Sequence, residues 1–210
     1  MSLPLRSAFA AALVLLSLPA AAQPAPVAAA PGRLFGETWR GTLLVGLSHL
    51  SDQDGLAARV DLDTDLVPLA PRAVIGAVLS LGFSRWSSSS TTILMPGYST
   101  ELASAANLVD LVPAFRVTIA TARPLSFHAD SGLGLSYSFG SATTRTVTPT
   151  GTVSASASAS GLGAVLRFAG GGAYEVKPGL KLGADLGLDI HFGETRGTAV
   201  TVLATAAYRL

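Results

Sequence analysis

Hydrophobic and polar residues alternate one by one between Leu180 and Phe192. Leucine, alanine, isoleucine and phenylalanine occupy every second position, and lysine, glycine, aspartate and histidine occupy the positions between them. Successive side chains of a β-strand point to opposite sides of the sheet, so this pattern predicts a strand with one apolar and one polar face. The same period of two recurs along most of the chain.

Eight segments with this alternation can be followed, which predicts an all-β chain. They are residues 38–50, 56–67, 73–85, 108–121, 125–140, 161–176, 180–192 and 198–210. Each is longer than the ~9–11 residues that a tilted strand needs to cross a bilayer. Pro113 lies inside the fourth segment and has no backbone donor, so we expect a bulge or a distortion there.

The connections between these segments alternate in length. Three short ones contain proline, and two long ones, 86–107 and 141–160, are polar. Short turns on one rim and longer loops on the other are typical of the periplasmic and extracellular ends of a membrane barrel. Residues 143–160 keep an alternation of their own, which suggests that this hairpin extends above the membrane.

Alternation alone does not decide whether the apolar face points outward to lipid or inward, as in a soluble lipocalin-like barrel. Charged residues make up 13% of the chain, which is about half of what a soluble surface carries. Aromatic residues gather at the two ends of the strands, as in the aromatic girdles of membrane barrels. They are Trp39, Phe127, Tyr174 and Tyr208 at one end, and Phe83, Trp86, Tyr137, Phe139 and Phe192 at the other.

The N-terminal residues predict export. Arg6 precedes an apolar stretch too short to span a bilayer, and an Ala-Ala-Ala cleavage site ends at residue 22, so residues 1–22 read as a signal peptide. Residues 23–33, rich in proline and alanine, are expected to form a flexible periplasmic segment. Residues 34–210 are predicted to form the barrel domain.

Composition narrows the function classes. The chain has no cysteine, which excludes disulfides, thiolate metal sites and a lipoprotein anchor. Without the signal peptide it is formally neutral and shows no basic face, so we expect no nucleic-acid partner. Mean hydropathy is high, at +0.49, yet nothing after residue 18 approaches the ~18–20 apolar residues of a membrane helix. A closed barrel is the membrane architecture that then satisfies the backbone.

Over about residues 34–210 the chain resembles the eight-stranded outer-membrane β-barrel proteins of the OmpA/OmpX type. Residues 200–210 resemble the C-terminal assembly signal of that class, with Tyr208 and Leu210 facing outward and a terminal leucine where phenylalanine or tryptophan is usual. The resemblance implies an antiparallel up-and-down transmembrane barrel in the cell outer membrane. It also implies contact with the barrel-assembly machinery, outer-membrane lipid and lipopolysaccharide. Members range from passive anchors to lipid A-modifying enzymes, so no function follows from it.

The polar face carries ionisable residues that would point into the lumen. Eight strands enclose a space just wide enough for side chains, and buried charges persist when they are paired. We interpret the set as a plug of ion pairs, with a narrow water-filled path as the alternative. Its members are Arg40, Arg59, Asp61, Asp63, Asp65, Asp110, Arg116, Asp130, Arg167 and Asp185.

Two groups within or beside this set could carry chemistry. Three carboxylates of one strand could bind calcium, but calcium sites usually wrap ligands from a loop, so arginine partners are the better interpretation. They are Asp61, Asp63 and Asp65. Ser126, His128 and Asp130 share one strand face, but substrate would not easily reach them inside a barrel. We interpret His128 as a lumen histidine with hydrogen-bond partners.

Residues near the long-loop rim offer a last possibility. His49 and His191 lie on strands separated by one other, at the height where lipid A-modifying barrels use histidine with serine and an acid. Arg85 falls on the lipid side and could pair with lipopolysaccharide phosphates. We expect no catalytic residue, cofactor or metal, and a monomer with a structural or surface-interaction role. The alternatives are a narrow porin-like channel for small solutes and a lipid A-modifying enzyme.

Overall fold

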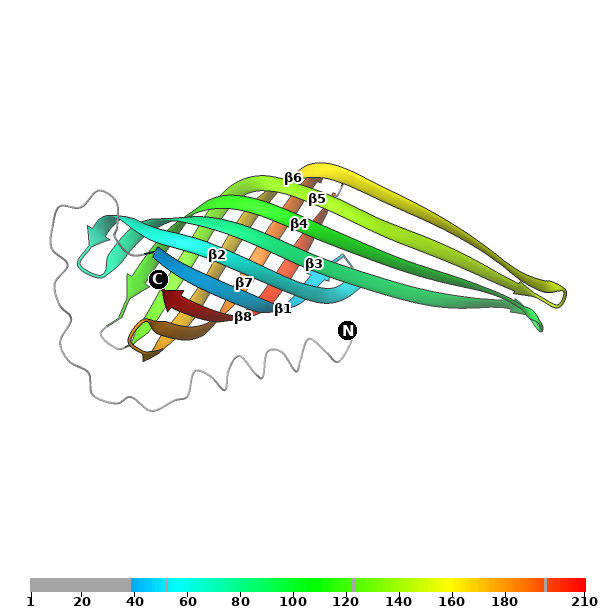
Figure 1. The fold of residues 1–210 in the computed structure, drawn as a ribbon, viewed down its shortest axis with the longest axis horizontal. Coiled ribbons are helices and arrows are strands. Elements are labelled where there is room, and N and C mark those ends of the chain that lie inside the picture. Colours follow the sequence, from blue (N-terminus) through cyan, green and yellow to red (C-terminus); the bar gives the residue numbers. More distant parts are fainter. Residues whose placement is uncertain (1–38, 52, 122–123, 195) are drawn as a thin grey trace.

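A computed structural model describes residues 39–210 except 52, 122–123 and 195. The predicted signal peptide, 1–22, and N-terminal segment, 23–33, lie outside the described residues. The strands are β1 Trp39–Leu50, β2 Gln53–Ala70, β3 Ala73–Met95, β4 Tyr98–Ala120, β5 Leu125–Thr148, β6 Gly151–Lys177, β7 Leu180–Gly193 and β8 Gly197–Arg209. Each strand pairs antiparallel with the next, and β1 pairs with β8, which closes the barrel (Figure 1). The predicted all-β fold, an eight-stranded up-and-down barrel, is confirmed.

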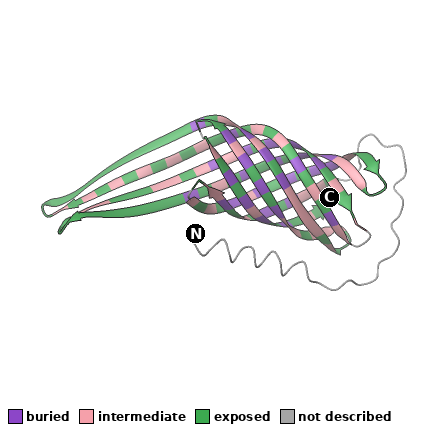
Figure 2. Ribbon diagram, turned by 180° about the vertical axis from the view of Figure 1, so that it is seen from behind, coloured by how far each residue is buried: buried purple, intermediate pink, exposed green. Residues whose placement is uncertain are grey.

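The alternation of side chains along each strand determines which of them face the lumen. On β1, Thr42, Leu44 and Ser48 are buried, whereas Leu43 and Val45 are about half exposed on the outer face. The other strands repeat this pattern, and Figure 2 shows buried and exposed positions alternating along the barrel. Large apolar side chains therefore cover the outside, and the polar face lines the lumen, as the sequence predicted. No helix among the described residues is long and apolar enough to cross a membrane.

Strands β3 to β6 continue far beyond the barrel. β3 and β4 stay paired from Ser87↔Ala105 to Met95↔Tyr98, and β5 and β6 stay paired to Thr148↔Gly151. β4 and β5 also pair along this extension, so the four strands form one sheet (Figure 1). We call this sheet the ribbon; it comprises residues 87–95, 98–106, 141–148 and 151–160. The predicted long loop at 86–107 is therefore wrong, whereas the suggested extension of the 143–160 hairpin is confirmed.

The half of the ribbon within 86–107 escaped prediction because its edge strand, 87–95, is exposed on both faces. With no buried face, hydrophobicity has no reason to alternate, and serine and threonine fill both sides. The signal that could have revealed the first hairpin is its tip, Pro96-Gly97. Gly97 has a φ of 82°, which fits the third position of a type II turn with proline before it.

Pro113 disturbs the sheet on one side only. Pairing of β4 with β5 stops after Leu111↔Leu135 and resumes at Ala114↔Gly132 in the same register. Pairing with β3, through Leu79, is continuous. The expected distortion is thus a local gap in the ladder without a bulge, because proline removes one donor and adds no residue.

Candidate functional site

Arg116 lies at the centre of a buried network in the short-turn half of the lumen. Its Nε and Nη2 donate to both oxygens of Asp130, at 2.7 and 2.6 Å. Nη1 donates to Asp63 at 3.1 Å, and Nη2 also reaches Asp61 at 3.2 Å. One guanidinium from β4 therefore ties together carboxylates from β2 and β5, and such charge-assisted bonds are the strong ones.

Two further arginines complete this network from β1 and β2. Arg40 donates from Nε to Asp63 at 2.7 Å and from Nη2 to Asp65 at 2.6 Å. Arg59 lies 3.0 Å from Asp61 and donates to Asp185 at 2.9 Å. The three carboxylates considered for calcium, at 61, 63 and 65, each contact at least one arginine, so guanidinium groups occupy the places that a cation would need.

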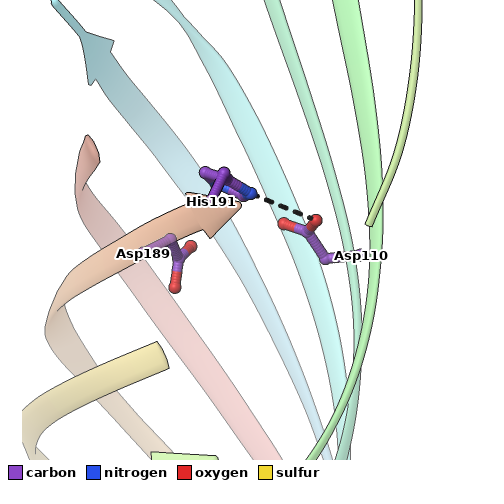
Figure 3. A group of neighbouring side chains, drawn as sticks. All are labelled: Asp110, Asp189 and His191. Carbon is purple, nitrogen blue, oxygen red and sulfur yellow. Dashed lines mark ion pairs between the residues drawn. The ribbon is translucent and has the colours of Figure 1, made fainter. Parts of the chain in front are cut away.

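A second network lies nearer the ribbon. Arg167 on β6 donates from Nε and Nη2 to both oxygens of Asp189, at 2.7 and 3.0 Å. The same Nη2 reaches Asp110 on β4 at 3.3 Å. Asp189 was missing from the predicted set, although its place on the polar face of the 180–192 alternation could have found it. His191, two residues further along β7, points toward Asp110 (Figure 3).

Apolar side chains also pack inside the lumen, in two clusters. Leu44, Ala57 and Leu203 form one buried cluster. Trp86, with an exposed fraction of 2%, forms another with Leu108 and Ala199, packed against Leu50. The prediction that Trp86 belongs to an outer aromatic girdle is wrong. Trp86 lies an even number of residues from the inward-facing residues of β3, so the alternation places it inside. The prediction gave more weight to its being an aromatic residue at a rim. The other eight predicted girdle residues are exposed on the outer face, as predicted.

Ser126, His128 and Asp130 share the lumen face of β5 but do not form a proton relay. His128 Nε2 lies 3.2 Å from Asp185 Oδ2, and the carboxylate of Asp130 is held by Arg116. The hydroxyl of Ser126 donates to the carbonyl of Ala173. Each side chain is therefore engaged with a different partner.

The two rim histidines do not come together. His49 faces outward, where its Nδ1 lies 2.7 Å from Asp54. His191 is buried in the lumen, with 4% of its surface exposed. A site on the lipid side could use His49 but not His191, so the pairing considered for lipid A chemistry is absent from the described part of the chain.

The remaining predicted residues lie on the outer face. Arg85 is exposed on the same face of β3 as Phe83, in a position to meet lipid headgroups. Tyr208 is exposed on β8, across from Gly41 and Leu180. Leu210 follows the strand, and its backbone N–H donates to the carbonyl of Trp39 at 2.9 Å. The roles in lipopolysaccharide contact and in assembly stay predictions.

Solved outer-membrane proteins resemble this chain, whereas no family model and no curated protein matches its sequence. A major outer membrane protein from Thermus thermophilus aligns at 16% identity with a TM-score of 0.51, over 82% of this chain and 99% of that one. Neisserial surface protein A aligns at 13% identity with a TM-score of 0.42, over 82% and 96%. The N-terminal β-barrel domain of Pseudomonas aeruginosa OprF aligns at 11% identity with a TM-score of 0.35, over 84% and 99%.

The similarity to the Thermus protein, with a TM-score of 0.51, is a similarity of fold, and the fold of this chain is a closed antiparallel meander of eight strands. The sequence resemblance is thereby confirmed at the level of fold. This chain has the fold of an outer-membrane β-barrel protein, built from eight strands.

Proposed function

We propose that this chain is an exported, monomeric outer-membrane protein whose barrel is a closed anchor and whose ribbon is a rigid surface for binding other molecules. The observation that carries the proposal is the ribbon itself. Its four strands continue barrel strands β3 to β6 and stay hydrogen-bonded to one another, so a binding surface is held at a fixed position instead of on mobile loops.

The outer face of the barrel supports a membrane location. Leu81, Leu135 and Leu186 are each about half or more exposed, and none of them has a protein partner that covers it in the described residues. An apolar surface of this extent is stable in lipid and aggregates in water. Arg85 lies at the ribbon end of this surface, where lipopolysaccharide phosphates would meet a guanidinium.

Filling of the lumen argues against the channel alternative. Arg116 and Arg167 each reach through the lumen to a carboxylate two strands away. Leu44, Val112 and Val165, which also face the lumen, have no exposed surface. A conducting path would need these side chains to move. Separation of His49 from His191 argues against the enzyme alternative, so we assign neither activity.

The ribbon has two free edges. β3 pairs with β2 only as far as Trp86, and β6 pairs with β7 only from Gly163 onward. Residues 87–95 and 151–162 therefore have no strand partner on one side among the described residues. The β6 edge, Gly151–Ser160, carries no charge and no proline, which are the usual means of blocking an edge. Such an edge can accept an extended polypeptide as an additional strand.

A binding assay with an unfolded polypeptide tests this function. Vesicles that contain the barrel are mixed with fluorescent, reduced and carboxymethylated α-lactalbumin. A shortened barrel, with residues 89–103 and 143–156 each replaced by Asn-Gly, keeps the paired ends Ser88↔Ser104 and Ala142↔Ala157. We expect the full chain to bind the probe and the shortened barrel to lose binding.

Two pairs of lysines separate edge pairing from general adhesion. Ser154→Lys with Ser158→Lys places charge on the edge strand β6. Ser141→Lys with Thr143→Lys places the same charge on the same sheet face, but on the inner strand β5. We expect the β6 pair to weaken binding and the β5 pair to leave it unchanged. Equal binding by the full and the shortened barrel would refute the proposed function.

A further inference from the structure

Among the described residues, His191 is a buried histidine without a hydrogen bond. Only 4% of its surface is exposed, and neither ring nitrogen has a hydrogen-bond partner. Its Nδ1 lies 3.9 Å from Oδ1 of Asp110, which is too long for a hydrogen bond. Burial of an unsatisfied imidazole costs free energy, so a ligand that takes up one of these nitrogens would stabilise the barrel.

The ring of His191 points toward the carboxylate of Asp110, and Asp189 lies beside it on β7 (Figure 3). One potential ligand atom each from Asp110, Asp189 and His191 lies within 4.8 Å of the other two. All three residues are buried. Ser136 lies directly across the β4–β5 ladder from Asp110 and can offer its hydroxyl, or a bound water, as a fourth ligand.

The charge balance of the lumen favours a cation at this point. The guanidinium groups of the two networks are Arg40, Arg59, Arg116 and Arg167, and the carboxylates are Asp61, Asp63, Asp65, Asp110, Asp130, Asp185 and Asp189. Four arginines thus face seven aspartates. At the proposed site itself one arginine, Arg167, faces two aspartates, Asp110 and Asp189, which leaves an excess of one negative charge. Lys181 and Glu175, near the short-turn rim, offset each other.

We propose that Asp110, Asp189 and His191 bind one divalent transition-metal ion, of which Zn²⁺ is the representative. Imidazole nitrogen with carboxylate oxygen is a ligand set that such ions accept. Arg167 holds both oxygens of Asp189 and Oδ2 of Asp110, as the partners of metal ligands commonly do. Unlike the carboxylates at 61, 63 and 65, Asp110 keeps one buried oxygen, Oδ1, without a hydrogen-bond partner, and this oxygen is left for the ion. A tetrahedral sphere with bonds of ~2.0–2.2 Å places its ligand atoms about 3.3–3.6 Å apart. Nδ1 of His191 and Oδ1 of Asp110, 3.9 Å apart, must therefore approach by roughly half an ångström, and the ligand atom of Asp189, within 4.8 Å of the other two, by up to roughly 1.5 Å.

Access to this site is restricted from the ribbon side. Ala199 lies across the ladder from Asp189, and Leu108 precedes Asp110 by two residues. Both belong to the apolar cluster of Trp86. The ion is therefore expected to enter while the barrel folds, before this cluster closes, and to exchange slowly afterwards.

Refolding in the presence of metal tests the proposal. The barrel is folded into detergent micelles with Zn²⁺ or Co²⁺, washed with chelator and assayed for bound metal. Folding is verified by heat-modifiable migration on gels. We expect about one equivalent of metal in the native chain and in His49→Ala, whose histidine faces outward. We expect less than a tenth of that in His191→Gln and in Asp110→Asn.

X-ray absorption spectroscopy of the native zinc-loaded barrel identifies the atoms bound to the metal. It needs no variant, so it tests the proposal even if a variant does not fold. An imidazole nitrogen in the coordination sphere, with oxygen as the other donor, supports the site. A folded native barrel that retains neither metal overturns the proposal, as does a folded His191→Gln barrel that retains as much metal as the native chain.

Discussion

Arg116 on β4 holds Asp130 on β5 through two parallel hydrogen bonds, from Nε to Oδ1 at 2.7 Å and from Nη2 to Oδ2 at 2.6 Å. The two residues are also direct partners in the strand ladder. A bidentate pair between adjacent strands fixes both side chains, and the remaining guanidinium hydrogens are left to reach across the lumen to β2. The network therefore ties β2, β4 and β5 together through the lumen.

Arg116→Ala should lower the stability of the barrel without preventing its insertion. The change leaves the carboxylate of Asp130 buried without its guanidinium, a loss typically worth ~3–5 kcal/mol. Urea unfolding in lipid vesicles measures this difference. Arg145→Ala, which removes an exposed arginine of the ribbon, is the control and should change stability little. Equal stability of all three proteins would mean that the lumen is hydrated and that the pairs contribute little.

Leu186→Arg should impair insertion. Leu186 is 55% exposed on the outer face of β7, and arginine near the middle of the bilayer costs ~2–4 kcal/mol. The yield of folded barrel in vesicles measures the effect. Ser156→Arg adds the same side chain to the ribbon, outside the bilayer in our account, and should fold like the native chain. Comparable losses from both variants would contradict the assignment of the outer face to lipid.

Tyr208→Ser and Leu210→Ser together should slow or prevent assembly in cells. Both side chains are exposed on the outer face, whereas the backbone bonds that close β8 on β1 do not depend on them. Accumulation of unfolded chain in the periplasm measures the effect. Leu210→Phe should assemble at least as well as the native chain. Normal outer-membrane levels of the double variant would show that these side chains are not the signal.

The shortened barrel, without the outer part of the ribbon, should fold with nearly native stability. The lumen networks involve residues between Arg40 and Asp189 that lie within the closed ring, and none of the ion pairs described for that ring includes a ribbon residue. Thermal unfolding in detergent measures this. A large drop in melting temperature would mean that the ribbon supports the barrel as well as extending from it.

Sequence periodicity could predict the barrel because each of its strands separates lipid from a polar lumen. The same period placed Arg40, Arg116 and Arg167 inside, and buried arginines require carboxylates, so the existence of ion pairs was predictable. Which carboxylate meets which arginine was not. Arg116 contacts Asp61 and Asp63 across the lumen, and such contacts depend on the stagger of the strands, which one sequence does not reveal.

Trp86, the ribbon and the isolation of His191 were missed for three different reasons. Periodicity gives the correct inward parity for Trp86, but its aromatic type at a rim suggested an outer girdle. Trp86 is an aromatic residue at a rim that packs inside, where it closes the lumen next to Leu108. The ribbon strand at 87–95 is exposed on both faces, so it lacks the alternation of apolar and polar residues that reveals a strand. The sequence placed His191 near the long-loop rim, which agrees with the structure. That its ring has no hydrogen-bond partner could be seen only from the positions of Asp110 and Asp189 in the structure.

The central claim is an outer-membrane barrel with its ribbon outside the cell, and cysteine labelling tests it most directly. The chain has no cysteine of its own, so Ser156→Cys in the ribbon and Arg72→Cys in the turn between β2 and β3 each give a single site. A membrane-impermeant maleimide applied to intact cells should label Ser156→Cys, and should label Arg72→Cys only after the outer membrane is opened. Labelling of Arg72→Cys in intact cells, with Ser156→Cys protected, would contradict the account.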